Sequence, residues 1–328
     1  MGMTVADLSH RLGEWDVEIR APHPSIRGVL AHYIEYLEGP LPVGAAGTLR
    51  FLFEAGAPEQ AGEAQDERGT LGYRFQRRRG ELLVSHAHAS GTARPDEGEA
   101  RFVIADSAVR DSELIRDLLS ITLAEMLRCR GLFAIHAALA EYRGAGVLVI
   151  GQTGAGKSTL SLGMAEAGMG VLTDDWALLD PTETAIRGRA LVRTASLPID
   201  QVRPGAMYHV LERREDEALP KVVVTRESLR APGELRPPLR LVVLASREAS
   251  AVSVMAPARR SDALARALGQ SPLLTADRAG FGRQAAALGR LVEECPLVTF
   301  RGGRDVALDP ARGGRMILRA LETATDAG

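Results

Sequence analysis

Residues 147–175 read VLVIGQTGAGKSTLSLGMAEAGMGVLTDD, and this stretch decides the fold class. It opens with the apolar run 147–150, which predicts a buried strand. Residues 151–158 follow with GxxxxGKS, the complete phosphate-binding loop pattern. A helix is expected over 160–167 and a second short strand over 169–172, so the stretch predicts a strand–loop–helix–strand unit of an α/β protein.

The residue types of the loop suit a phosphate. Gly151, Gly154 and Gly156 allow positive φ, which turns backbone N–H groups inward, and the following helix points its positive end at the same place. Lys157 reaches the β- and γ-phosphates, and the Ser158 hydroxyl can ligate Mg²⁺. The residues expected to contact ATP are consecutive: Gly151, Gln152, Thr153, Gly154, Ala155, Gly156, Lys157, Ser158 and Thr159.

Lysine is rare in this chain, which makes its place in the loop informative. Lys157 and Lys221 are the only lysines among 40 basic residues, and the others are arginine. A compact ammonium fits inside a phosphate loop where a planar guanidinium does not. The rarity of lysine therefore argues against a chance match at Lys157.

Asp174 and Asp175 follow the second strand directly. Parallel strands of a βαβ unit end at one edge of the sheet, so both carboxylates are expected beside the loop. One can hold Mg²⁺ while the other accepts a proton from an attacking hydroxyl. We expect Ser158 and Asp175 to hold the metal, although the residues leave open which aspartate is the base.

The segment from His136 through the loop resembles the HPr kinase/phosphorylase family. The shared features are a histidine before the first core strand, a glycine-flanked strand, the loop, a helix and a strand that ends in Asp-Asp, over residues 132–180. The resemblance implies a fold related to ATP-dependent phosphoenolpyruvate carboxykinase, with a mixed sheet flanked by helices. It also implies that His136 lies near the transferring phosphate, that Asp174 or Asp175 activates a serine hydroxyl, and that the protein is a homo-oligomer.

Two departures from the family pattern bear on the acceptor. Thr159 stands where the bacterial HPr enzymes usually carry glutamate, and the family's Glu-x-Arg-Gly-Leu-Gly stretch is missing, although residues 186–189 echo part of it. The sequence therefore resembles a divergent member of the family. We expect it to phosphorylate a hydroxyl, such as serine, of another peptide, protein or small molecule.

The composition and charge of the chain indicate which binding partners and which compartment to expect. The chain has 328 residues, 45% of them hydrophobic, and a net charge of −2, so no bulk attraction to nucleic acid or to an anionic membrane is expected. Cys129 and Cys295 match no metal-ligand spacing and favour a reducing, cytoplasmic compartment.

Residues 1–110 are expected to form a β-rich accessory region, and residues 111–324 the phosphate-loop domain. The segments expected in the accessory region are strands at 28–34, 48–53 and 101–104, a hairpin over 72–84, and loops at 56–69 and 89–99. Asp111 is expected to cap a helix that runs to about residue 130.

The elements expected after the aspartates are a hairpin over 176–192, strands at 239–245, 251–255 and 296–300, and helices at 261–269, 282–294 and 314–323. Phosphoryl transfer also needs cations at the outer phosphate. The candidates are Arg193, Arg203, Lys221 and Arg247.

A different class of protein with the same loop is an ATPase or a nucleotide-dependent switch with no phosphoacceptor. The chain has neither a Leu-Ser-Gly-Gly-Gln signature nor an Asn-Lys-x-Asp guanine-recognition motif. Phosphate transfer to an acceptor other than water would separate a kinase from this alternative.

Overall fold

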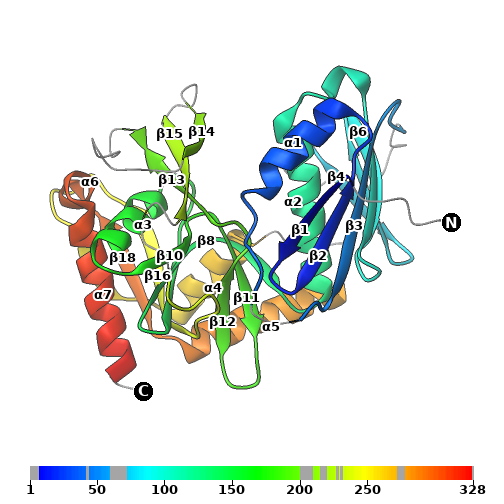
Figure 1. Ribbon diagram of the computed structural model, residues 1–328. Coiled ribbons are helices and arrows are strands. Elements are labelled where there is room, and N and C mark those ends of the chain that lie inside the picture. The colour runs from blue at the N-terminus through cyan, green and yellow to red at the C-terminus, as the bar shows by residue number, and fades with distance from the viewer. Residues whose placement is uncertain are drawn as a thin grey trace. The chain divides into compact units, whose positions relative to one another are not determined.

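The computed structural model describes residues 7–41, 44–59, 72–199, 210–214, 220–226, 229, 232–271 and 278–326. The chain forms two compact units (Figure 1). Unit 1 comprises Met1–Gly131 with Pro272–Gly282, and unit 2 comprises Leu132–Ser271 with Arg283–Gly328. The expectation of a mixed α/β protein with a β-rich N-terminal part is confirmed.

Unit 1 is a mixed sheet that packs against two helices. Its strands lie in the order β1-β2-β3-β7-β6-β5-β4, with β2, β3 and β7 parallel and the other neighbours antiparallel. Its elements are β1 (Leu8–Leu12), β2 (Trp15–Arg20), α1 (Pro24–Ile34), β3 (Gly47–Ala55), β4 (Arg74–Arg78), β5 (Glu81–His86), β6 (Ala89–Arg94), β7 (Glu99–Ile104), the 3₁₀ turn Asp106–Ala108 and α2 (Ser112–Cys129).

The division between the units falls after Gly131 and not at residue 110. The reason is α2, which the sequence assigned to the phosphate-loop domain. Its apolar stripe, including Leu114, Leu118 and Leu123, is buried in unit 1, where α2 also packs against α1. Asp111 does cap this helix, because its side chain accepts a hydrogen bond from Leu114 N at 3.0 Å.

Two expectations for unit 1 are wrong. Residues 28–34 are helical within α1, where Pro24 occupies the first turn and Ile26, Leu30 and Tyr33 bury one helical face. Residues 89–94 form β6 and residue 99 begins β7, so the connection is the short turn 95–98 rather than a loop over 89–99. The strands at 48–53 and 101–104 and the hairpin of β4 with β5 are confirmed. Residues 60–71, most of the loop expected at 56–69, lie outside the described residues.

Unit 2 is built on a mixed sheet in the order β12-β11-β8-β9-β16-β18-β17, with β10 beside one end of β8. The strands β9, β16 and β18 are parallel, and the other pairs are antiparallel. A separate small sheet has the order β13-β15-β14.

The strands of unit 2 are β8 (Phe133–Tyr142), β9 (Ala145–Ile150), β10 (Gly170–Thr173), β11 (Trp176–Pro181), β12 (Ile186–Ala190), β13 (Thr194–Pro198), β14 (Val210–Arg214), β15 (Lys221–Thr225), β16 (Leu239–Arg247), β17 (Val254–Pro257) and β18 (Leu297–Gly302). Its helices are α3 (Lys157–Glu166), α4 (Arg260–Gly269), most of α5 (Arg278–Glu294), α6 (Arg304–Leu308) and α7 (Pro310–Asp326). The expected hairpin of β11 with β12, the strands β16 and β18 and the helices α4, α5 and α7 are confirmed, whereas β17 begins later than expected. The N-cap of α4 is Arg259.

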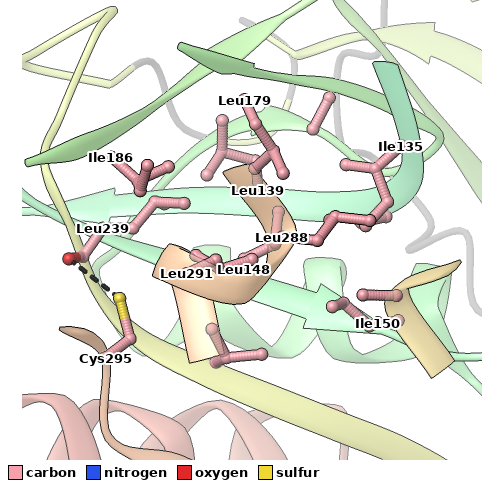
Figure 2. Packing of buried hydrophobic residues seen from close by; sticks show 14 of the residues in the cluster. Ile135, Leu139, Leu148, Ile150, Leu179, Ile186, Leu239, Leu288, Leu291 and Cys295 are labelled. Atoms are coloured by element: carbon pink, nitrogen blue, oxygen red, sulfur yellow. Dashed lines mark hydrogen bonds between the residues drawn. The ribbon is translucent and has the colours of Figure 1, made fainter. Parts of the chain in front are cut away.

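Helices cover both faces of the large sheet. On one face α4 and α5 contribute Ala263, Ala267, Leu288 and Leu291 to a core with β8, β9 and β16 (Figure 2). On the other face α3 and α7 pack Leu160, Met164, Ile317 and Leu321 against the same strands. The central strand β9 is therefore buried at every residue, as its apolar sequence requires.

The relation between β9 and β10 positions the candidate site. Both strands are antiparallel to β8, which lies between them, so they run in the same direction without pairing. Their carboxyl ends therefore lie at the same edge of the sheet.

Among the described residues, we find no helix with the length and apolar character needed to cross a bilayer.

Candidate functional site

The loop after β9 uses its glycines for two different reasons. Gly154 and Gly156 have φ values of +81° and +92°, and the left-handed Gly156 is the N-cap of α3. Gly151 does not have positive φ, contrary to expectation. A side-chain carbon there would lie 2.8 Å from Ala155 Cβ and 2.9 Å from the Ala245 carbonyl oxygen, so Gly151 is required by close packing.

Lys157 folds back into this loop. Its Nζ donates a hydrogen bond to the Gly151 carbonyl oxygen at 2.7 Å, and only 7% of the residue is exposed. Burial lowers the pKa of the Lys157 ammonium, the charges of Asp175 and Asp174 oppose this effect, and Lys221 adds to it. A buried ammonium held by backbone carbonyls is well placed to exchange them for phosphate oxygens.

Asp174 is enclosed by protein. It is 3% exposed, and its Oδ2 accepts a hydrogen bond from Ser196 N of β13 at 2.9 Å. Burial and the charge of Asp175 raise the pKa of the Asp174 carboxyl to about 6, against the effects of Ser196, the Ser158 hydroxyl and Lys221. Its Oδ1 is buried without a hydrogen-bond partner in the part of the chain that the structure describes.

Asp175 has a different environment from Asp174. Its side chain is 48% exposed, and its Oδ1 lies 2.9 Å from Nε2 of His136. Its backbone oxygen accepts a hydrogen bond from Ala137 N at 2.9 Å, which fixes the aspartate to β8. Trp176 is the register partner of His136 and packs beside its ring, with the two ring centroids 5.6 Å apart. His136 and Asp175 therefore form an accessible acid–base pair.

The strand register shows how the loop is flanked. Ile150, the last residue of β9, pairs with Ala137 of β8 on one side and with Leu244 of β16 on the other. His136 therefore lies one position beyond the end of β9 on the first neighbour, and Ala245 one position beyond it on the second. The loop leaves the sheet between these two residues.

The small sheet brings Lys221 to the site. Its strand β13 bonds Asp174 through Ser196, and Pro198, two residues further along β13, pairs with Lys221 of β15. Lys221 lies close enough for its charge to lower the pKa of both Lys157 and Asp174. Of the cations suggested by the sequence, Lys221 is thus brought near the loop.

The other candidate cations have weaker links to the loop. Arg247 ends β16 at the same sheet edge, beyond Ala245, and Arg193 precedes β13, where its carbonyl oxygen accepts a hydrogen bond from Arg226 N. Arg203 lies outside the described residues. A cation that the sequence did not suggest is Arg266 of α4, whose Nη1 donates to the Ala245 carbonyl oxygen at 3.2 Å.

The residues beside the loop fit a magnesium ion. The unpartnered buried Oδ1 of Asp174 and the neighbouring Ser158 hydroxyl are hard oxygen donors, which Mg²⁺ prefers. Within the described residues there is no cluster of three or more His, Cys, Asp or Glu side chains arranged to hold a metal ion.

Comparison with models of known protein families finds no match to this chain. A search of curated proteins also finds no matching sequence.

Proposed function

We propose that this protein is an ATP-dependent kinase that transfers the γ-phosphate of Mg-ATP to a hydroxyl group, such as that of serine, on a peptide, a protein or a small molecule. We further propose that unit 2 is a phosphate-loop domain of the HPr-kinase-like type. The observation that carries this proposal is the His136–Asp175 contact of 2.9 Å at the sheet edge from which the GxxxxGKS loop leaves. A kinase uses a base at this position to take the proton of an acceptor hydroxyl, and an ATPase would use the same base on water, so the acceptor test below separates the two.

The two aspartates take different roles in this proposal. Asp174 is enclosed, so an acceptor hydroxyl cannot reach it; its side chain interacts with Ser158, and its buried Oδ1 has no hydrogen-bond partner among the described residues, so it would hold the metal. Asp175 is half-exposed, and its Oδ1 lies 2.9 Å from His136 Nε2, so it is the accessible base. This assignment moves the metal-binding role from Asp175 to Asp174, and Mg²⁺ would supply charge neutralisation at the phosphates.

Transfer would then proceed as an in-line displacement. The acceptor hydroxyl gives its proton to Asp175, and its oxygen forms a bond to the γ-phosphorus. The bond from that phosphorus to the β–γ bridging oxygen breaks, and ADP leaves with the electron pair. The ammonium of Lys157, the loop amides and Lys221 stabilise the charge on the moving phosphoryl group and on ADP.

The proposal is tested by initial rates of ADP release from Mg-ATP. The purified full-length protein would be given water alone, free serine and other small hydroxyl compounds, an HPr-like protein, or peptides encoded by neighbouring genes. We expect one acceptor to raise the rate well above that in water. A rate that no acceptor changes would instead support the ATPase alternative.

A further inference from the structure

Arg266 contacts a backbone carbonyl group that lies beside the first residue of the loop. Its Nη1 donates to the Ala245 carbonyl oxygen at 3.2 Å. That same oxygen would lie 2.9 Å from a side-chain carbon at Gly151, so it abuts the first residue of the loop. The guanidinium and Gly151 therefore both lie next to the same carbonyl oxygen.

The Lys157 ammonium lies beside Gly151, the first residue of the loop. Its Nζ lies 2.7 Å from the Gly151 carbonyl oxygen. A lysine at this place in the loop pattern reaches the β- and γ-phosphates, so the surroundings of Gly151 correspond to the outer end of a triphosphate. From this geometry we propose that Arg266 binds the γ-phosphate of ATP and makes the site distinguish ATP from ADP. The inference rests on the kinase function proposed above.

The charge of the site leaves room for another cation. The two lysines near the loop, Lys157 and Lys221, are matched by the two carboxylates of Asp174 and Asp175. When ATP binds, the two lysines are shared between these carboxylates and the triphosphate, so a further cation helps to offset the phosphate charge that Mg²⁺ does not neutralise. Within the described residues, the side-chain hydrogen bond of Arg266 is with a neutral carbonyl group, and no carboxylate forms an ion pair with it.

The helix that carries Arg266 is fixed to both neighbours of the loop. Arg266, in the last turn of α4, bonds Ala245 of β16, and at the same end of the helix the carbonyl oxygen of the C-cap Gln270 accepts a hydrogen bond from His136 N of β8 at 2.8 Å. Ala263 and Ala267 are fully buried in the core beneath the sheet. A guanidinium has five N–H donors in a rigid fork, so the contact with Ala245 leaves donors for two phosphate oxygens.

The test is the ratio of the affinities for the two nucleotides, measured by calorimetry. Wild type, Arg266→Gln and Arg260→Gln would each be titrated with Mg-ADP and with a magnesium complex of a non-hydrolysable ATP analogue. Arg260 is the matched control, because it is an exposed arginine in the first turn of the same helix. Arg266→Gln should weaken binding of the ATP analogue by about ten- to a hundredfold and leave Mg-ADP binding within about twofold. Arg260→Gln should behave as wild type.

The outcomes separate this inference from the kinase proposal. If wild type prefers the ATP analogue and Arg266→Gln keeps the same preference, the role of Arg266 is overturned while the nucleotide site stands. An equal loss for both nucleotides also overturns it, because the residue would then act on the loop in general. Absence of binding to wild type overturns both proposals. Arg266→Lys, which keeps the charge but not the fork, should fall between wild type and Arg266→Gln, and unchanged melting temperatures would confirm folding.

Discussion

Replacing Asp174 by asparagine should stabilise the empty protein, although it removes a residue from the candidate site. Burial, followed by the charge of Asp175, raises the pKa of the Asp174 carboxyl from 3.8 to about 6. Each pKa unit corresponds to about 1.4 kcal/mol, so ionised Asp174 destabilises the folded state by on the order of 3 kcal/mol. An asparagine has no charge to bury, and its oxygen can still accept the hydrogen bond from Ser196 N.

The direction of this stability difference and the pH range over which it develops follow from the linkage between proton binding and folding. Below about pH 3 the carboxyl is protonated in both the folded and the unfolded chain, so its raised pKa costs nothing. As pH rises from about 4 to 6, the unfolded chain releases this proton first, and the folded state loses stability relative to it. Above about pH 7 the cost is constant. The stability difference between Asp174→Asn and wild type should therefore grow over this range and then level off.

Urea denaturation of the nucleotide-free protein at several pH values measures this difference. We expect Asp174→Asn to unfold at higher urea than wild type at pH 7.5, by about 1–3 kcal/mol, and the advantage to shrink by pH 5. Asp309→Asn is the control, since Asp309 is exposed and pairs with exposed Arg315. Adding Mg-ATP should reverse the order, because wild type gains more from the ligand. A variant that is less stable at pH 7.5, or a difference that does not change with pH, would refute the reasoning.

Three further variants test the site and the packing around it. Asp175→Asn should leave Mg-ATP binding nearly unchanged and slow phosphate transfer by about 10²- to 10⁴-fold; wild-type transfer rates would exclude it as the base. Gly163→Ala in α3 places a carbon 2.0 Å from the Pro310 carbonyl oxygen of α7 and should lower the free energy of unfolding by about 1–3 kcal/mol or more. Gly289→Ala is the control in denaturation, because a carbon there meets nothing within 4 Å. Equal free energies of unfolding for the two variants would contradict the close contact of α3 with α7. Asp305→Ala should cost about 1–3 kcal/mol in urea denaturation, because Oδ1 accepts hydrogen bonds from Ser253 N, Ser253 Oγ and Val306 N; a neutral result would mean that these bonds are not needed.

The centre of the fold could be predicted from the sequence because it is encoded locally. The apolar run before Gly151, the glycines with positive φ at 154 and 156 and the helix that follows are short-range signals, and the structure has each of them. The edge position of Asp174 and Asp175 also follows from the direction of two strands. The position of the antiparallel strand β8 between β9 and β10 could not be predicted in this way, because strand order depends on contacts between distant segments.

The errors in unit 1 have identifiable causes. The apolar cluster at 28–34 was interpreted as a strand, whereas the spacing of Ile26, Leu30 and Tyr33 and the preceding Pro24 are signals of a helix. The glycine-containing stretch 89–99 was interpreted as a loop. Gly91 lies instead within β6, where a side-chain carbon would be 2.2 Å from the Phe102 ring on the neighbouring strand.

Part of the candidate site could not be predicted locally. Ser196 donates a hydrogen bond to Asp174 through its backbone N–H, and the residue type gives no signal of such a contact. Arg266 is one of many arginines, and its place beside the loop depends on how α4 packs against the sheet. Lys221 is one of the four candidate cations from the sequence, and the pairing of β13 with β15, which brings it near the loop, is not a local signal.

The central claim is that the loop at 151–159 presents ATP for transfer to an acceptor hydroxyl. It is tested most directly by mass spectrometry of each acceptor after incubation with Mg-ATP and either wild type or Lys157→Ala. We predict that wild type adds one phosphate to one acceptor and releases one equivalent of ADP, and that Lys157→Ala does neither. Transfer by Lys157→Ala at the wild-type rate, or a wild-type protein that leaves ATP and every acceptor unchanged, would contradict the account.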